Sequence, residues 1–473
     1  MDSFNRQRRC AQLPSPPVSR DAAADETRKY GRSAAQLTIA LGVAGVLTYL
    51  FFALASRGLD KDQYGEIVVL WSAVFLLSAT LFRPIEQLLA RTLAERDHAG
   101  AEAGDALRAA AKIQGGLCIA ALVVLLALKG PARDNLFSDD PGLYWALLVA
   151  LVGFACAFYA RGFLAGRGQF MLYAVLLQIE VLLRLFFALI VAVGLAEGTS
   201  LIALGIALAP IAGLAVIPVA IRRGRPNAAD IDPDDSPLAD ELTLGSGGAF
   251  AGAVLLMMLS EQVLVSSGAL FVRASEGAAA AGFIFNMLMV ARAPLLLFQA
   301  IAASLLPHLT RLRARGDEDS QDAFHTSLTS TMLLIAAFAA ATTLGVLLIG
   351  PQVMQLAFGD KFTYDRVGLV IVAIGMGFYL VAASLNQAAL AQGQARRAAI
   401  PWVICASAFV AYNLLSPGDP FRAVEVGFTG AAVLLSGMLW WVYTHPHPSV
   451  GDEITPGSGR EVQARLDALD EIA

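Results

Sequence analysis

Apolar stretches about as long as a bilayer is thick recur along the whole chain and constrain its fold most strongly. A helix needs about 20 apolar residues to cross a hydrocarbon core about 30 Å thick. Twelve stretches meet that length: 34–56, 64–90, 107–128, 142–164, 171–194, 200–221, 246–270, 277–305, 325–349, 367–390, 398–415 and 423–444. Only 15% of the residues are charged, against about a quarter in soluble proteins. We therefore predict an all-α, polytopic membrane protein with twelve transmembrane helices.

The distribution of Arg and Lys predicts the orientation of these helices. Cations collect on the cytoplasmic side of membrane proteins. Placing the N-terminus inside puts most cations in cytoplasmic segments, with at least two in every internal one, and both termini are then cytoplasmic. The predicted organisation is a disordered cytoplasmic tail (1–32), an N-lobe (33–221), a cytoplasmic linker (222–245), a C-lobe (246–444) and a cytoplasmic tail with the spacing of a short amphipathic helix (445–473).

Metal and nucleotide chemistry find little support in the sequence. The four cysteines have no CxxC spacing, and the close pair His445 and His447 has no Cys or carboxylate neighbour. Asp230 and Asp232 have the spacing of a metal-bound nucleotide-sugar site, but their acidic, Pro-rich loop is too short for a nucleotide-binding domain. We predict no metal, no cofactor and no nucleic-acid partner.

Arg292 is the strongest candidate for a functional charge within the membrane. It lies near the centre of the eighth apolar stretch, with no acidic residue within a turn, and a charge there costs about 3 kcal/mol on insertion scales. Pro294 predicts a kink just beyond it. Asn286 precedes it on the same helix, and Gln299 lies close to its face. This arrangement predicts an anion site more strongly than a structural role.

Other polar residues in the apolar stretches are candidates for the lining of a cavity or for ion coupling. Glu180 and Arg184 are four residues apart, so we expect a neutralised pair on one helix face, either structural or lining a polar path. Glu261, next to Gln262, is either the partner of Arg292 or a site for a coupling H⁺ or Na⁺. Asn386 is expected to add polar lining.

Arg83 interrupts the end of the second stretch in “SATLFRPIEQLLARTLAER”. The apolar run before it, 67–82, spans about 24 Å as helix, which places Arg83 near the inner headgroups. Two roles are equally consistent with that position: an anchor at the interface, or a ligand that captures a phosphate at the inner leaflet.

Five stretches resemble one known family: “ASRGLDKDQYGEIVVLWS”, “YARGFLAGRGQFMLYA”, “ARAPLLLFQAIAASLLPHLTRLRARGD”, “LAFGDKFTYD” and “NQAALAQGQARRAA”. They resemble the polysaccharide exporters of the MOP superfamily, the Wzx-type flippases, which are distant relatives of MurJ and MATE proteins. The resemblance implies two six-helix lobes in a V around a cavity whose cations hold a pyrophosphate. By position it assigns that role to Arg292 and Arg83. Unlike MurJ-like proteins, this chain has no arginine within its first helix, which argues against lipid II as substrate.

We therefore expect a flippase of the bacterial cytoplasmic (inner) membrane. It would move a polyprenyl-pyrophosphate-linked oligosaccharide for cell-surface polysaccharide, including lipopolysaccharide, biosynthesis by alternating access. Its expected partners are that glycan lipid, the membrane, and the polymerase and glycosyltransferases of the same pathway. The alternatives are a MATE-like small-molecule exporter and a transport-inactive scaffold. A membrane enzyme is disfavoured because the predicted outer loops are short.

Overall fold

The computed structural model describes residues 20–98, 104–222, 244–293, 318–392 and 394–445. We call 20–222 the N-lobe and 244–445 the C-lobe. The helices of the N-lobe are α2 (Arg20–Gly58), α3 (Lys61–His98), α4 (Gly104–Ala127), α5 (Lys129–Phe137), α6 (Pro141–Gly166), α7 (Phe170–Ala192), α8 (Thr199–Gly213), the 3₁₀ turn η1 (Leu214–Val216) and α9 (Ile217–Arg222). Those of the C-lobe are α10 (Leu244–Ser266), α11 (Gly268–Glu276), the helix Ala278–Ala293, α13 (Glu318–Phe358), α14 (Arg366–Ala391), α15 (Ala395–Leu415) and α16 (Pro420–Thr444).

The helical, membrane-spanning architecture is confirmed. Ten helices in the described ranges are long and apolar enough to cross a membrane, or up to eleven when one bent pair is counted as a single span. Burial separates inner from outer helices: two thirds (67%) of the apolar window is buried in both α3 and α6, but only 11% in α13. The exposed Leu, Ile and Val side chains of the outer helices are suited to contact lipid.

The structure departs from the predicted segments at three places. The stretch 246–270 was expected to be one helix, but it breaks between Ser266 and Gly268, and the two parts, α10 and α11, are bent by 45°. The predicted outer loop after Lys129 is largely a helix, α5. Helix α2 begins at Arg20, inside the segment expected to be disordered. Pro294, with its predicted kink, and the tail 446–473 lie outside the described residues.

Close backbone approach holds the centre of the N-lobe together. A Cβ atom at Gly162 would stand 2.8 Å from the Glu86 carbonyl oxygen, and one at Gly166 would stand 2.7 Å from that of Ala90. Only glycine therefore lets α6 pack this closely against α3, as small residues do in membrane helix pairs. Asp140 begins α6 by accepting a hydrogen bond from Gly142 N at 2.6 Å, with Pro at the first helical position.

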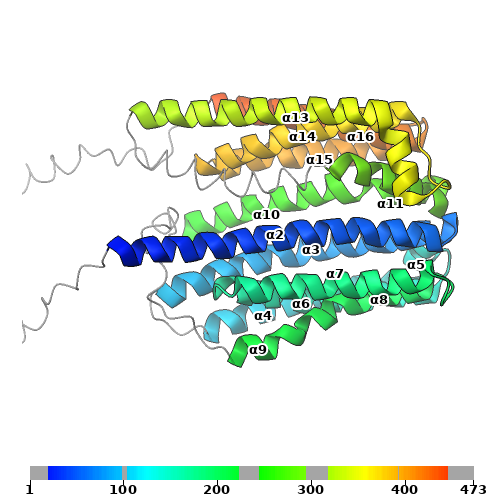
Figure 1. Cartoon of the computed structure of the whole chain (residues 1–473), viewed down its shortest axis with the longest axis horizontal. Coiled ribbons are helices and arrows are strands. Elements are labelled where there is room, and N and C mark those ends of the chain that lie inside the picture. The colour runs from blue at the N-terminus through cyan, green and yellow to red at the C-terminus, as the bar shows by residue number, and fades with distance from the viewer. Residues whose placement is uncertain (1–19, 99–103, 223–243, 294–317, 393, 446–473) are drawn as a thin grey trace, which may run out of the picture.

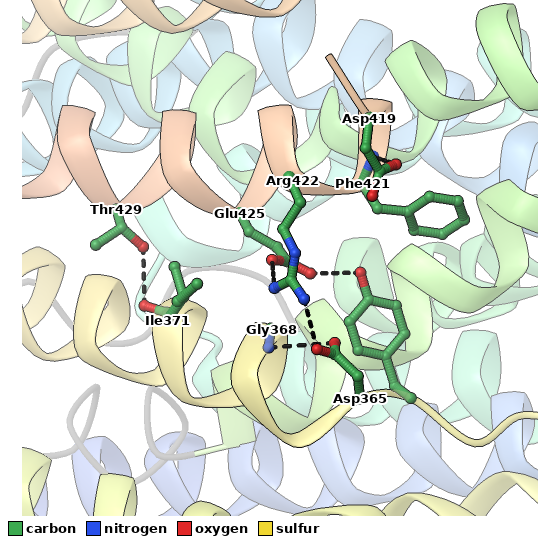
Figure 2. Close-up of polar contacts among 9 residues, drawn as sticks. Asp365, Gly368, Ile371, Asp419, Phe421, Arg422, Glu425 and Thr429 are labelled. Atoms are coloured by element: carbon green, nitrogen blue, oxygen red, sulfur yellow. Dashed lines mark hydrogen bonds and ion pairs between the residues drawn. The ribbon is translucent and has the colours of Figure 1, made fainter.

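Two helices of the C-lobe also begin with an Asp residue that caps the first turn. Asp365 caps α14 by accepting from Gly368 N at 3.2 Å, and Asp419 caps α16 by accepting from Phe421 N at 3.0 Å. Thr429 of α16 donates to the Ile371 carbonyl of α14 at 2.8 Å, so the two helices run side by side (Figure 2).

The lobes meet at the end of the molecule that holds α5 and α11, whereas α9 and the start of α2 lie at the opposite end (Figure 1). Four side chains donate to backbone carbonyls across the lobes, and we call them the lobe latch: Arg57 to Leu356 (2.5 Å), Lys361 to Leu59 (3.3 Å), Arg273 to Leu136 (3.0 Å) and, further from this end, Tyr49 to Met289 (2.8 Å). The orientation predicted from the cations would make this the outer end, and the lobes would then be closed toward the outside.

Tight packing completes this contact. Gly65 of α3 lies against the backbone of Ala278, where a Cβ would stand only 1.8 Å from the carbonyl oxygen. One residue earlier, the buried Tyr64 donates to the amide oxygen of Asn286 on the facing helix. The helices of the two lobes therefore cross with their backbones almost touching.

Candidate functional site

Arg292 lies at the break between α10 and α11. In a continuous helix the Val265 carbonyl would accept a hydrogen bond from the N–H of Ala269, four residues later. The bend between α10 and α11 interrupts the helix at this point and leaves the carbonyl for another donor. The Arg292 guanidinium donates an Nη2 hydrogen bond to this carbonyl. A cation at the carboxyl end of a helix is stabilised by the helix dipole. Arg292 therefore caps the carboxyl end of α10, a role that its own helix sequence does not reveal.

One donor of the Arg292 guanidinium is not used by the described part of the chain. Its Nε is buried and has no hydrogen-bond partner among the described residues. A buried donor without a partner costs about 1–3 kcal/mol, so a bound anion that accepted from it would be stabilised. The anion site at Arg292 stays a prediction, and Nε is the donor that such an anion would use.

Two tyrosines from different lobes surround Arg292. Tyr49 of α2 and Tyr379 of α14 both interact electrostatically with its guanidinium. Tyr379 Oη donates to Glu261 Oε1 at 2.9 Å, so the carboxylate predicted to pair with Arg292 is bound by this tyrosine. We call Tyr49, Glu261, Arg292 and Tyr379 the central cluster. Neither tyrosine was singled out from the sequence.

Arg83 lies between the central cluster and a second charged group in the N-lobe. Its side chain is exposed, and it interacts electrostatically with Tyr379 of the C-lobe and with Glu86 and Tyr173 of the N-lobe. Tyr173 donates to Glu86 Oε1 at 2.7 Å. An exposed cation within electrostatic range of both lobes is suited to contact a ligand held between them.

The prediction that Glu180 forms its ion pair with Arg184 is wrong. Glu180 forms a buried ion pair with Arg161 of α6, at 2.5 Å, while Arg184 donates Nε to the backbone carbonyl of Glu180 at 3.1 Å. The Arg184 guanidinium lies 4.8 Å from the ring of Trp71, a cation–π contact. Arg161 was not among the predicted site residues; it lies more than a turn inside α6 and is only 8% exposed.

The remaining predicted residues either have other hydrogen-bond partners or lie outside the described ranges. Asn286 is fully buried and serves the contact between the lobes. Asn386 accepts from Trp402 Nε1 at 3.1 Å within the C-lobe. Gln262 accepts from Ser266 Oγ at 3.5 Å beside the helix break. Gln299 lies outside the described residues. Of the predicted residues, the structure places Arg292, Glu261 and Arg83 around one site.

A separate polar group joins the ends of α14 and α16 (Figure 2). Arg422 pairs with Asp365 at 2.5 Å and with Glu425 at 2.6 Å, and Glu425 also accepts from Tyr364 Oη at 2.5 Å. Burial and the bond to Glu425 raise the pKa of Tyr364 well above its ordinary value. Because each of these residues has a partner within the same lobe, we interpret the group as a structural clamp.

The comparisons with known proteins bear mainly on the fold. No family model matches the chain. An uncharacterized Mycobacterium tuberculosis protein, Rv3630, is 23% identical over 377 residues, which are 75% of this chain and 81% of that protein. An inward-facing multidrug resistance MATE family transporter of the MOP superfamily superposes with a TM-score of 0.61 at 16% identity, covering 85% of this chain and 96% of that one.

Two further MATE structures agree. The outward-facing multidrug resistance transporter gives a TM-score of 0.58 at 16% identity, covering 87% and 95% of the two chains. The Vibrio cholerae transporter VcmN in its bent form gives 0.54 at 16% identity, covering 89% and 97%. The chain has the MATE fold. At these identities the likeness defines the architecture, and the site residues rest on their own geometry.

Proposed function

We propose that this chain is a transporter that moves a polyprenyl-pyrophosphate-linked oligosaccharide between the leaflets of the bacterial cytoplasmic membrane. In this proposal Arg292 and Arg83 hold the pyrophosphate between the lobes while the lipid tail stays in the bilayer. The unpartnered Nε of Arg292 is the observation that carries it, because a phosphate oxygen is a strong acceptor for a guanidinium.

The charges around the site favour an anionic ligand. Arg292 and Arg83 are two cations that both interact with Tyr379. The acids near them are Glu261 in the central cluster and Glu86 beside Arg83, and Glu86 is already bound by Tyr173. The carboxylate of Glu261 is already bound by Tyr379. An anion bridging Arg292 and Arg83 would neutralise both and draw α3 toward the C-lobe.

The geometry of Arg292 also supplies a link between binding and movement. A phosphate that bound the guanidinium would compete with the Val265 carbonyl for its Nη2 donor. Loss of that cap would destabilise the bend between α10 and α11, and α11 carries Arg273 of the lobe latch. Ligand binding would in this way loosen the outer contact, which is the coupling that alternating access requires.

A MATE-like exporter of a small cationic compound is the second candidate. Two solved structures with this fold are multidrug resistance MATE family transporters, and Glu261 supplies one carboxylate to the central cluster. The two candidates differ in the sign of the ligand charge, so Arg292 is required by the first and unfavourable for the second.

Reconstitution separates them. The purified full-length chain is reconstituted into proteoliposomes whose membrane contains a fluorescent polyprenyl-pyrophosphate oligosaccharide. Flipping is measured as the fraction of the fluorescent lipid that an impermeant quencher can reach. We expect Arg292→Ala to abolish flipping at normal protein level, with Arg366→Ala, an exposed arginine at the start of α14, as the matched control. Undiminished flipping by Arg292→Ala would refute the anion site, and uptake of an organic cation in place of flipping would favour the exporter.

A further inference from the structure

Two apolar grooves run along the C-lobe on either side of α15. One, of about 460 Å³, lies between α10 and α15, and the other, of about 280 Å³, lies between α15 and α16. Ile400 of α15 lines both grooves and separates them. Neither groove includes any residue of the central cluster.

The walls of these grooves are suited to hydrocarbon chains. Leu256, Ile400 and Ile404 are 45%, 59% and 44% exposed, and all three belong to membrane-spanning helices. Gly252 widens the first groove, since nothing lies within 4 Å of the position where its Cβ would stand. The lining from Arg396 to Ile404 extends about 12 Å along α15, enough for much of one acyl chain.

One arginine stands at the mouth of each groove. Arg396 lines the larger groove, is exposed, and has no hydrogen bond or ion pair with the described part of the chain. Arg397 lines the smaller groove and is held in place, donating to the His445 carbonyl at 2.6 Å and to Gln394 Oε1 at 3.1 Å. The pair therefore combines a fixed cation with a free one.

Aromatic side chains place this pair at the membrane surface. Trp440 and Trp441, in the last turns of α16, are 49% and 56% exposed. Exposed Trp residues at the end of a spanning helix mark the headgroup level. The Arg397 guanidinium lies 5.7 Å from the Trp441 ring, so the two arginines lie at that level, and the grooves reach into the acyl region.

We infer that Arg396, Arg397 and the two grooves form a binding site for an anionic phospholipid of the adjacent leaflet. The phosphate contacts Arg396, and the two acyl chains occupy the two grooves on either side of Ile400. Two grooves diverging from one pair of cations match a two-chain lipid better than the single chain of a polyprenyl phosphate. The site is separate from the proposed transport site and does not depend on it.

Native mass spectrometry of the full-length chain tests this inference. The protein is delipidated in detergent and titrated with phosphatidylglycerol or with phosphatidylcholine of the same acyl chains. We expect preferential retention of phosphatidylglycerol, and a loss of about fivefold in its affinity in Arg396→Ala, the effect of one cation near the membrane surface. Arg222→Ala, which removes an exposed arginine at the same end of the N-lobe, is the matched control.

A second variant tests the grooves apart from the charge. Leu256→Trp fills the larger groove from α10 and leaves Arg396 in place, so it should weaken both phospholipids. Its melting temperature in detergent identifies a variant that fails to fold. Equal retention of the two phospholipids by the unmodified chain, or equal losses in Arg396→Ala and Arg222→Ala, would overturn the inference. So would displacement of phosphatidylglycerol by equimolar polyprenyl phosphate, because the grooves would then belong to a single-chain lipid.

Discussion

Gly65→Ala should open the contact between the lobes. The added methyl group would lie 1.8 Å from the Ala278 carbonyl oxygen and 2.9 Å from Ala279 N, both of them backbone atoms that cannot rotate away. Cβ atoms essentially never approach another heavy atom closer than 3.0 Å. The two helices must therefore separate by more than about 1 Å, and only the closed arrangement of the lobes is penalised.

The size of the effect follows from that overlap. Forcing an extra methyl into a packed contact costs about 1–3 kcal/mol. A penalty of that size on the closed state alone changes the ratio of open to closed molecules by roughly 5- to 150-fold. A protein that is closed toward the outside would thus spend a much larger part of its time open there.

Cysteine labelling measures this shift. The four native cysteines are replaced by alanine, and Ala278→Cys, a position that is 5% exposed, reports on the contact through its reaction with a membrane-impermeant maleimide added from outside. We expect faster labelling with Gly65→Ala. The control is Gly437→Ala in α16, whose Cβ would meet nothing within 4 Å. Equal labelling rates in the two folded variants would refute the argument from the overlap.

Three other substitutions test the polar contacts. Arg161→Ala leaves Glu180 buried without its partner, so unfolding in detergent should become easier by about 3–5 kcal/mol, and adding Glu180→Gln should restore part of the loss. Asp365→Asn removes the ion pair with Arg422, whose side chains are 41% and 46% exposed, so the free energy of unfolding should fall by less than about 1 kcal/mol in the same assay. A larger loss would contradict the argument that solvent screens this ion pair. Tyr64→Phe removes a hydrogen bond between the lobes and should accelerate maleimide labelling in the same direction as the glycine substitution; unchanged labelling would show that this bond does not hold the lobes closed.

The sequence was sufficient to predict the spanning helices because their apolar length is a local property. Ten of the twelve predicted stretches correspond to single described spans. The break after Ser266 was not predicted, although Ser266, Ser267 and Gly268 form the Ser/Gly combination at which helices often kink. The side chain that caps the broken end, Arg292, comes from another helix. The local sequence permits a break at this point, but the arginine that caps it could not be identified from spacing along the chain.

The candidate site was predicted in its charges but not in its pairings. Arg292, Arg83 and Glu180 were recognisable because a charge in an apolar run is costly. Their partners depend on helix packing, which brings Arg161 to Glu180 from the neighbouring helix and Tyr379 to Glu261 from another part of the C-lobe. The four-residue spacing along one helix predicted Arg184 as the partner of Glu180, because spacing carries no information about side chains on neighbouring helices.

The lobe latch has a consequence for how this protein tolerates sequence change. Each of its four hydrogen bonds ends on a backbone carbonyl, which every amino acid possesses. A mutational scan should therefore be asymmetric, with the acceptor positions accepting many side chains of similar size and the donor positions accepting few. The acceptor half of each latch hydrogen bond is in this sense insensitive to point mutation, unlike the packing at Gly65.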